Sequence, residues 1–143
     1  MKIFLEKINI PSTKRIDLID ITRHVENFVR RCGVTDGLCL VYALHTTAAI
    51  IVNEHEGGLI QDIISKVEQT FPRGAGYLHD RIDDNADAHL ASTFIGPSKT
   101  FPIKDNKIIR GTWQNIFFLE TDGPRSQREV IMEILGEEMN KNH

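Results

Sequence analysis

The sequence predicts an α+β fold: a mixed, mainly antiparallel β-sheet or barrel-like core with two or three helices. Three observations predict this class. Apolar residues recur with helical spacing in two segments and capping residues flank a third, whereas the rest of the chain reads as short strands. The late strands arrive as hairpins, which favours antiparallel pairing. The length of 143 residues, 41% hydrophobic and 26% charged, suits a single globular domain spanning residues 1–143.

The chain begins with two predicted strands and a helix. Residues 1–9 and 15–19 alternate apolar and polar side chains, and Pro11-Ser12 between them reads as a turn. A helix follows because one apolar stripe continues through Ile21, Val25, Phe28 and Val29. Asp20 or Thr22 is expected to cap this helix, and Gly33 to end it in a left-handed conformation.

The middle of the chain should form the centre of the sheet. Asp36-Gly37 reads as a turn, and the apolar run 38–44 as a central strand buried on both faces. A second strand, 48–52, follows the polar interruption at 45–47. The segment 57–71 then repeats apolar residues every four positions, as a buried helix face does, and Pro72 ends it.

The last part of the chain predicts a short helix and four strands. Asn85 is expected to cap a helix over 86–95, which Gly96-Pro97 closes. The remaining predicted strands are 99–103 and 107–110, joined by a tight turn, then 116–120 and 129–135.

Charge and composition exclude several classes of protein. The net charge is −3 and the basic residues are scattered, which argues against nucleic acid as a partner. No apolar run approaches the ~20 residues of a membrane span, and the N-terminal apolar segment is too short for a signal peptide. We therefore expect a cytoplasmic protein. Cys32 and Cys39 match no redox or zinc spacing, and reduced structural thiols are favoured over a disulfide.

One candidate site segment interrupts the two central strands. His45, Thr46 and Thr47 would cost about 1–3 kcal/mol each if they were buried without hydrogen-bond partners. They either face a cleft or form a bend in which the hydroxyl groups satisfy freed backbone groups. The sequence alone leaves both readings open.

The densest polar segment, residues 79–89, contains two histidines, four aspartates and an asparagine. Imidazole and carboxylate groups are ligands that zinc prefers. A calcium loop fits poorly, because Ala88 occupies the position that needs glycine. His89 and Ser92 would share one face of the short helix. The alternative is a solvated acidic loop in which the aspartates only cap the helix.

Three other places offer polar or aromatic groups. Trp113 and Gln114 precede a strand and could line a pocket, although a lone tryptophan is more often part of the core. Arg125, together with Arg128, could bind a phosphate or carboxylate, or lie in an exposed turn. Asn53-Glu54 could add a carboxylate to the cleft or only cap the helix that begins at Gly57.

The ordered set of these motifs resembles the YjbQ family. The matching segments are His45-Thr46-Thr47-Ala48-Ala49, Asn53-Glu54, Tyr77-x-His79-Asp80, Asn85 to His89, Gly96-x-Ser98, Gly111-Thr112-Trp113-Gln114 and Asp122-Gly123-Pro124-Arg125. The resemblance implies an α+β fold, assembly as a homotrimer, and a secondary thiamine-phosphate synthase activity that joins a thiazole phosphate to a pyrimidine diphosphate. It also implies a metal or anion site at the family's histidines.

We therefore predict one site for a small phosphorylated molecule. The metal, zinc as the best candidate, would bind His45, His79 and His89; the competing hypothesis is that these histidines bind a phosphate directly. His45, Glu54 and Asp80 would be catalytic. The substrate-binding residues would be Thr46, Thr47, Asn85, Ser92, Trp113, Gln114 and Arg125. The alternative function is a non-catalytic metal- or phosphate-binding protein.

Overall fold

The computed structural model describes residues 1–138, which form a single α+β domain, as expected; residues 139–143 of the predicted domain lie outside this range. Three helices and one 3₁₀ helix accompany the strands. In chain order the elements are β1 (Lys2–Ser12), β2 (Asp17–Asp20), α1 (Thr22–Cys32), β3 (Val34–Ala43), β4 (Ala48–Asn53), α2 (Gly57–Thr70), η1 (Leu78–Arg81), α3 (Ala86–Ile95), β5 (Ser98–Lys104), β6 (Lys107–Ile108), β7 (Asn115–Glu120) and β8 (Arg125–Glu138).

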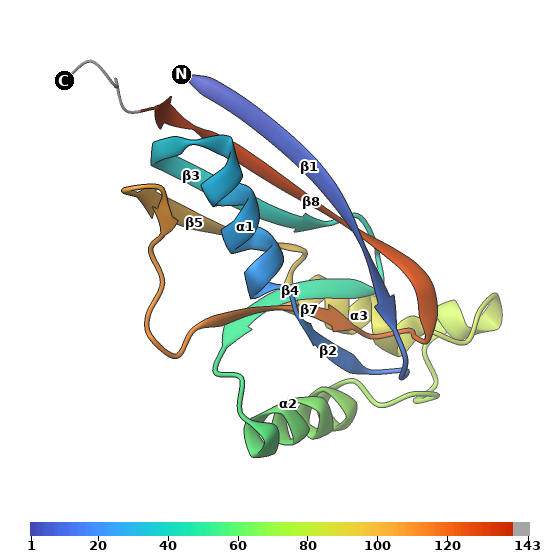
Figure 1. Ribbon diagram of the computed structural model, residues 1–143. Helices are drawn as coiled ribbons and strands as arrows, with labels where there is room; N and C mark the ends of the chain where they lie inside the picture. Colours follow the sequence, from blue (N-terminus) through green and yellow to red (C-terminus); the bar gives the residue numbers. More distant parts are fainter. Residues whose placement is uncertain (139–143) are drawn as a thin grey trace.

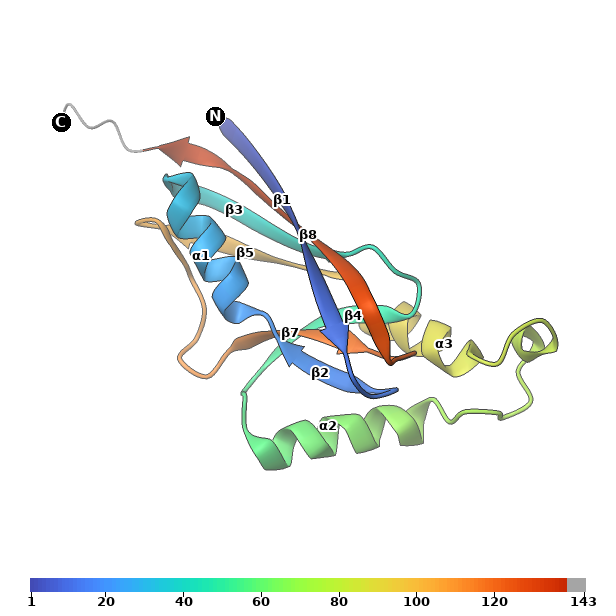
Figure 2. The same cartoon turned by 45° about the vertical axis from the view of Figure 1, so that its right-hand side comes forward.

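The strands form two sheets, and every pairing in them is antiparallel. The larger sheet has the order β1-β8-β3-β5-β6, and the smaller has the order β2-β7-β4. Figures 1 and 2 show the long strands β1 and β8 side by side. Helix α1 packs against one face of the larger sheet. Both figures place α2 and α3 beyond the smaller sheet.

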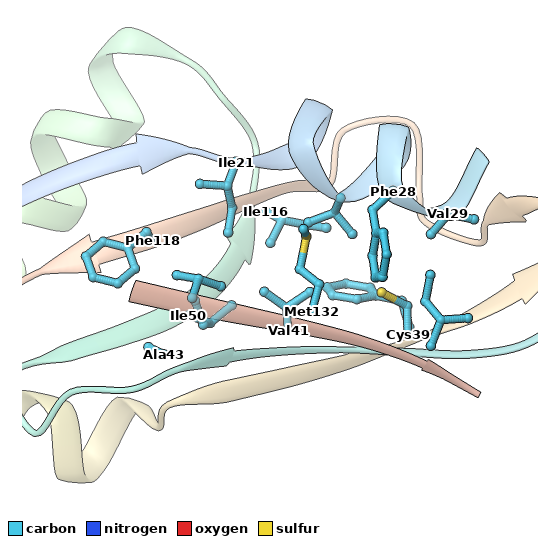
Figure 3. Close-up of a cluster of buried hydrophobic side chains, with 14 of the residues drawn as sticks. Ile21, Phe28, Val29, Cys39, Val41, Ala43, Ile50, Ile116, Phe118 and Met132 are labelled. Carbon is cyan, nitrogen blue, oxygen red and sulfur yellow. The ribbon is translucent and has the colours of Figure 1, made fainter. Parts of the chain in front are cut away.

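The main core lies between the two sheets and α1. The inner face of the larger sheet contributes Cys39, Val41 and Met132, which pack with Phe28 of α1 and Phe118 of β7 (Figure 3). The alternation predicted for the last strand is confirmed, because Val130, Met132 and Ile134 are all fully buried. A second cluster, in which Val67 of α2 and Ala91 of α3 meet Leu119, covers the other face of the smaller sheet.

The outer face of the larger sheet has no covering element among the described residues. Strand β3 is central, as predicted, but it is buried on one face only. Its other face, with β1 and β8 beside it, exposes five large side chains: Ile3, Leu5, Leu38, Tyr42 and Leu135. The prediction that this strand is buried on both faces, which was based on the continuous apolar run 38–44, was therefore wrong. We call these five residues the outer face.

Two predicted turns belong to strands instead. Pro11-Ser12 forms the last two residues of β1, where the pairing with β8 shifts register between Ile10 and Ser12. Asp36-Gly37 lies within β3. A Cβ atom on Gly37 would come within 2.1 Å of the Leu135 carbonyl oxygen, so this glycine permits close approach of two strands rather than a turn.

Other local predictions are confirmed. Helix α3 spans 86–95, and Gly33 ends α1 in a left-handed conformation with φ 75°. The 104–107 hairpin is closed by Asp105 and Asn106, both with positive φ, as a tight hairpin turn requires. None of the helices formed by residues 1–138 combines the length and the apolar composition needed to cross a lipid bilayer.

Candidate functional site

Two of the three predicted histidines form a direct pair. The 3₁₀ helix η1 carries His79, and the second turn of α3 carries His89. Their ring centroids are 4.6 Å apart, and the rings meet edge to face. Both residues are partly exposed, so a ligand can reach them. The structure thus brings together two of the three histidines that were predicted to share a site.

A hydrogen-bonded chain behind the pair fixes the orientation of His79. The carboxylate of Asp122 accepts a hydrogen bond of 2.8 Å from Nδ2 of Asn85. The amide oxygen of Asn85 then faces Nε2 of His79 at 3.2 Å, so that Nε2 must donate. In the neutral imidazole the lone pair therefore lies on Nδ1 of His79. Metal-binding histidines are commonly oriented by such a second hydrogen bond.

The capping of α3 differs from the prediction. Asn85 occupies the N-cap position, but its side chain makes no capping hydrogen bond and instead joins the chain to His79. An oxygen of Asp80 accepts the hydrogen bond of 3.1 Å from the Ala86 amide. Asp80, predicted as catalytic, thus has a structural contact that orders the start of α3.

Arginine side chains pair with the carboxylates around the hydrogen-bonded chain from Asp122 to His79. Arg15 binds both oxygens of Asp87, at 3.0 and 3.1 Å, and Oδ1 of Asp122 at 3.2 Å. Arg125 donates to Oδ2 of Asp122 at 2.9 Å. Sequence reasoning missed Arg15, because its partners lie 72 and 107 residues away and no local motif marks it. We call His79, His89, Asn85, Asp122, Arg15 and Arg125 the histidine cluster.

A buried ion pair lies next to the histidine cluster. Arg128, 4% exposed, pairs with Glu120, 0% exposed, and also donates to Thr47 Oγ1 at 2.9 Å. Burial alone would raise the pKa of Glu120, but hydrogen bonds from Arg128, Ser12 and the Asp122 amide outweigh it and lower the pKa. Arg128 is therefore engaged by a carboxylate rather than available to a phosphate.

His45 makes a different contact from the one predicted. Its Nε2 accepts a hydrogen bond of 2.7 Å from the Glu129 amide, so only Nδ1 remains for a metal. Burial and the charge of Arg128 lower the pKa of His45, which favours the neutral imidazole. The His45 segment still meets α3, because the Thr121 hydroxyl contacts both the Thr47 and Ala88 carbonyl oxygens, at 2.6 and 3.2 Å.

The hydroxyl residues predicted to bind substrate take up different positions. Thr46 is exposed, whereas Thr47 is buried against Arg128. Ser92 is also buried, and its hydroxyl donates to the Ala48 carbonyl at 2.6 Å. Thr47 and Ser92 therefore hold the bend and α3 in place, but the Thr47 hydroxyl pairs with the Arg128 side chain and not with a freed backbone group, as the bend reading had required.

Three predicted site residues lie at the opposite end of the smaller sheet. Strands β4 and β7 pair Ala48 with Glu120 at one end and Asn53 with Asn115 at the other. Five steps of about 3.4 Å separate these ends, roughly 17 Å in all. Glu54 and Trp113 line a hollow at the Asn115 end, and Gln114 belongs to the same loop. Grouping these three with the histidine cluster of the same chain was wrong, because sequence order does not reveal which end of an antiparallel strand a loop joins.

Among residues 1–138 the structure gathers no group of three or more His, Cys, Asp or Glu side chains in metal-binding geometry. His79 and His89 supply two nitrogen donors. What the histidine cluster offers chemically is a pair of imidazoles, one of them fixed in its tautomer, beside Arg125, which is half exposed.

Comparison with known proteins gives the relationships of the chain. The family model described as UPF0047 protein YjbQ-like matches residues 6–137. A UPF0047 protein of Archaeoglobus fulgidus is 47% identical over 87% of this chain and 97% of its own length. The UPF0047 protein YugU of Bacillus subtilis is 37% identical over 92% and 99%. The crystal structure of a YbjQ-like protein of unknown function from Sulfolobus solfataricus superimposes with a TM-score of 0.94, at 46% identity over 95% of this chain and 99% of that one. The chain belongs to the UPF0047, YjbQ-like family.

Proposed function

We propose that the histidine cluster is the working site and that it binds a small phosphorylated molecule together with a divalent metal ion, best zinc. The observation that carries the proposal is the chain from Asp122 through Asn85 to His79. Asn85 is buried, and both ends of its side-chain amide belong to the chain of hydrogen bonds that orients His79. Such a second hydrogen bond is typical of a histidine that binds a metal ion.

The donor set fits zinc in part. His79 and His89 would hold the ion, and His45 could add Nδ1 as a third donor only if its segment moves toward them. Catalytic zinc sites keep a coordination position open, and phosphate oxygens are suitable ligands for it. When bound, the ion would stabilise negative charge on a phosphate group.

The activity that we propose is a thiamine-phosphate synthase-type transfer. A ring nitrogen of a thiazole phosphate forms a bond to the methylene carbon of a pyrimidine diphosphate, and the carbon–oxygen bond to the leaving diphosphate breaks. Such a step needs stabilisation of the leaving group more than a strong nucleophile. Arg125 and the exposed hydroxyl of Thr46 are the residues of this chain that we expect to bind phosphate oxygens.

A second candidate function is non-catalytic binding of a metal or phosphate, and the saturation of the arginines favours its metal-binding form over catalysis. Arg15, Arg125 and Arg128 each already pair with a carboxylate. A leaving diphosphate would have to compete with Asp122 for Arg125. Turnover of the two phosphorylated substrates distinguishes the transferase from the non-catalytic binding protein.

We expect His79→Ala to reduce turnover of the two phosphorylated substrates by about 10²-fold or more, because it removes both a ligand and the group that Asn85 orients. Release of diphosphate and formation of thiamine phosphate are measured with untagged protein. His24→Ala, which removes an exposed imidazole from α1, is the matched control and should keep full activity. Equal residual turnover in wild type and His79→Ala would leave only the binding function.

We further propose that the outer face is buried between copies of the chain in a homotrimer. Its five large side chains form one apolar surface across β1, β8 and β3, and Ile3 is 63% exposed. Contiguous apolar surface of this kind commonly marks an interface between proteins. A second copy of the same chain is the partner that the family resemblance favours.

Leu38→Glu should convert the protein to a monomer, because it places a charge within the outer face, beside Leu135. Sedimentation equilibrium at micromolar concentration is expected to give about three times the chain mass of 16.3 kDa for the wild type, and one chain mass for the variant. Ile82→Glu alters an equally apolar exposed residue outside the outer face and should leave the mass unchanged. A wild-type mass of one chain would refute the trimer.

A further inference from the structure

A polar hollow of about 470 Å³ lies at the Asn115 end of the smaller sheet, away from the histidine cluster. Its lining residues come from the segment after β4 and the loop before β7: Glu54, His55, Glu56, Thr112, Trp113 and Asn115. We call it the Trp113 hollow. It brings together a fixed imidazole, an exposed indole and carboxylates.

The imidazole of His55 is held by Asp20 in one tautomer. Nδ1 of His55 lies 2.6 Å from Oδ2 of Asp20. Burial would raise the pKa of Asp20, but hydrogen bonds from Thr22, His55 and Asn115 outweigh it and lower the pKa to about 2. Asp20 is therefore a carboxylate that only accepts, so Nδ1 of His55 carries a proton, and in the neutral imidazole the lone pair lies on Nε2.

Asp20 and His55 are themselves fixed in position. Oδ1 of Asp20 accepts from the amide and hydroxyl of Thr22, at 2.9 and 2.6 Å, and Oδ2 also accepts from Asn115 Nδ2 at 2.7 Å. The His55 ring packs against Phe117, with ring centroids 5.4 Å apart. His55 is nevertheless half exposed. The result is a rigid hydrogen-bond acceptor that a ligand can reach.

Trp113 is exposed because an ordered loop holds it there. The Gln114 side chain accepts a hydrogen bond of 2.7 Å from the Gly111 amide, and Arg110 donates to the Gln114 carbonyl at 2.6 Å. The loop is thus closed without using the indole, which remains 71% exposed. An indole presented by a rigid loop offers its face to apolar groups and cations.

The charge of the hollow selects the kind of ligand. Its lining, among the described residues, includes the carboxylates of Glu54 and Glu56 but neither lysine nor arginine. Hydrogen bonds from the Gly58 and Leu59 amides lower the pKa of Glu56, so it stays ionised. Negative charge beside an aromatic face favours a cation and disfavours a phosphate.

We propose that the Trp113 hollow binds a small organic ammonium ion, with an N–H group donating to Nε2 of His55, the charge beside Glu54, and the carbon skeleton on the face of Trp113. Each of the three contacts selects a different property of the ligand: a hydrogen-bond donor, a positive charge and an apolar surface. The site is separate from the histidine cluster and does not depend on the function proposed for that cluster.

Trp113 is the only tryptophan of the chain, so its fluorescence reports directly on this hollow. Three probes with the same ring separate the contacts: benzylammonium, benzyltrimethylammonium and benzyl alcohol. We expect benzylammonium to bind most tightly, and benzyl alcohol about tenfold or more weakly because it lacks the charge. Benzyltrimethylammonium, which has the charge but no N–H, should lie between them.

Two variants assign the contacts. Glu54→Gln should weaken both cations by about threefold to tenfold and leave benzyl alcohol unchanged. His55→Phe keeps a ring against Phe117 and should abolish the preference for benzylammonium over benzyltrimethylammonium. Glu68→Gln is the matched control, because it removes an exposed carboxylate near the end of α2 and outside the hollow. It should leave the affinities for all three probes unchanged.

Equal affinity for the alcohol and the two cations would overturn the proposal, as would cation affinities unaffected by Glu54→Gln. Circular dichroism verifies that each variant is folded. If His55→Phe does not fold, Glu54→Gln and the comparison of the three probes still decide the result.

Discussion

Glu120→Ala is expected to lower the free energy of unfolding by about 3–5 kcal/mol, because it leaves the guanidinium of Arg128 buried without its partner. Arg128 is 4% exposed, and its main partner is Glu120. The substitution also removes the acceptor for the Ser12 hydroxyl, at 2.7 Å, and for the Asp122 amide, at 3.0 Å. Urea unfolding of the wild type and the variant measures the difference.

The double variant Glu120→Leu/Arg128→Met tests the cause of this loss. It removes both charges and fills the space with apolar groups, so it should recover much of the stability. A single variant that loses less than about 1 kcal/mol would show that Arg128 finds water or another acceptor.

The same pair makes a contribution to stability that depends on pH. Because the pKa of Glu120 is lower in the folded state than in the unfolded chain, its contribution is fully present above the ordinary glutamate value. It is lost as the pH falls through the lowered folded value. Glu120→Gln should therefore flatten the acid limb of the stability profile.

Zinc affinity at the histidine cluster is expected to fall steeply between pH 7.5 and pH 5.5. A metal binds only the neutral imidazole, so each bound histidine adds up to about tenfold loss of zinc affinity per pH unit once protons compete for the ring. Two such ligands, His79 and His89, would give up to about 100-fold per unit.

The competing hypothesis predicts the opposite sign. If the imidazoles bind a phosphate without a metal, protonated rings bind it better, and phosphate affinity should rise as the pH falls through this range. Calorimetric titration of zinc and of inorganic phosphate into metal-free protein at both pH values distinguishes the two. Weak binding of both ligands without pH dependence would mean that the histidines form no site.

Local signals in the sequence predicted much of the fold. The helix at 86–95, the left-handed Gly33 and the 104–107 hairpin each depend on neighbouring residues, which a sequence displays directly. The turn predicted at Asp36-Gly37 was wrong because Gly37 serves a contact with Leu135, almost a hundred positions away. A glycine required by a distant backbone looks the same in sequence as one required by a turn.

The candidate site was predicted only in part, for a related reason. His79 and His89 lie ten residues apart on consecutive helices, so their proximity follows from local structure. The bond from Asn85 to Asp122 and the pairing of Arg15 with Asp87 join segments that only the complete sheet brings together. The misplacement of Glu54 and Trp113 has the same origin, because the strand pairing decides which loops share an end.

Calorimetric titration of zinc at pH 7.5 into wild type, His79→Ala, Asn85→Ala and His24→Ala tests the histidine cluster most directly. We predict about one zinc ion per chain in the wild type and in His24→Ala, and less than about 0.2 in His79→Ala. Asn85→Ala, which touches no metal in this proposal, should bind about 10–100-fold more weakly because His79 loses its orienting hydrogen bond. Zinc binding that is absent from the wild type, or identical in all four proteins, would contradict the proposal that His79 and His89 form a metal site.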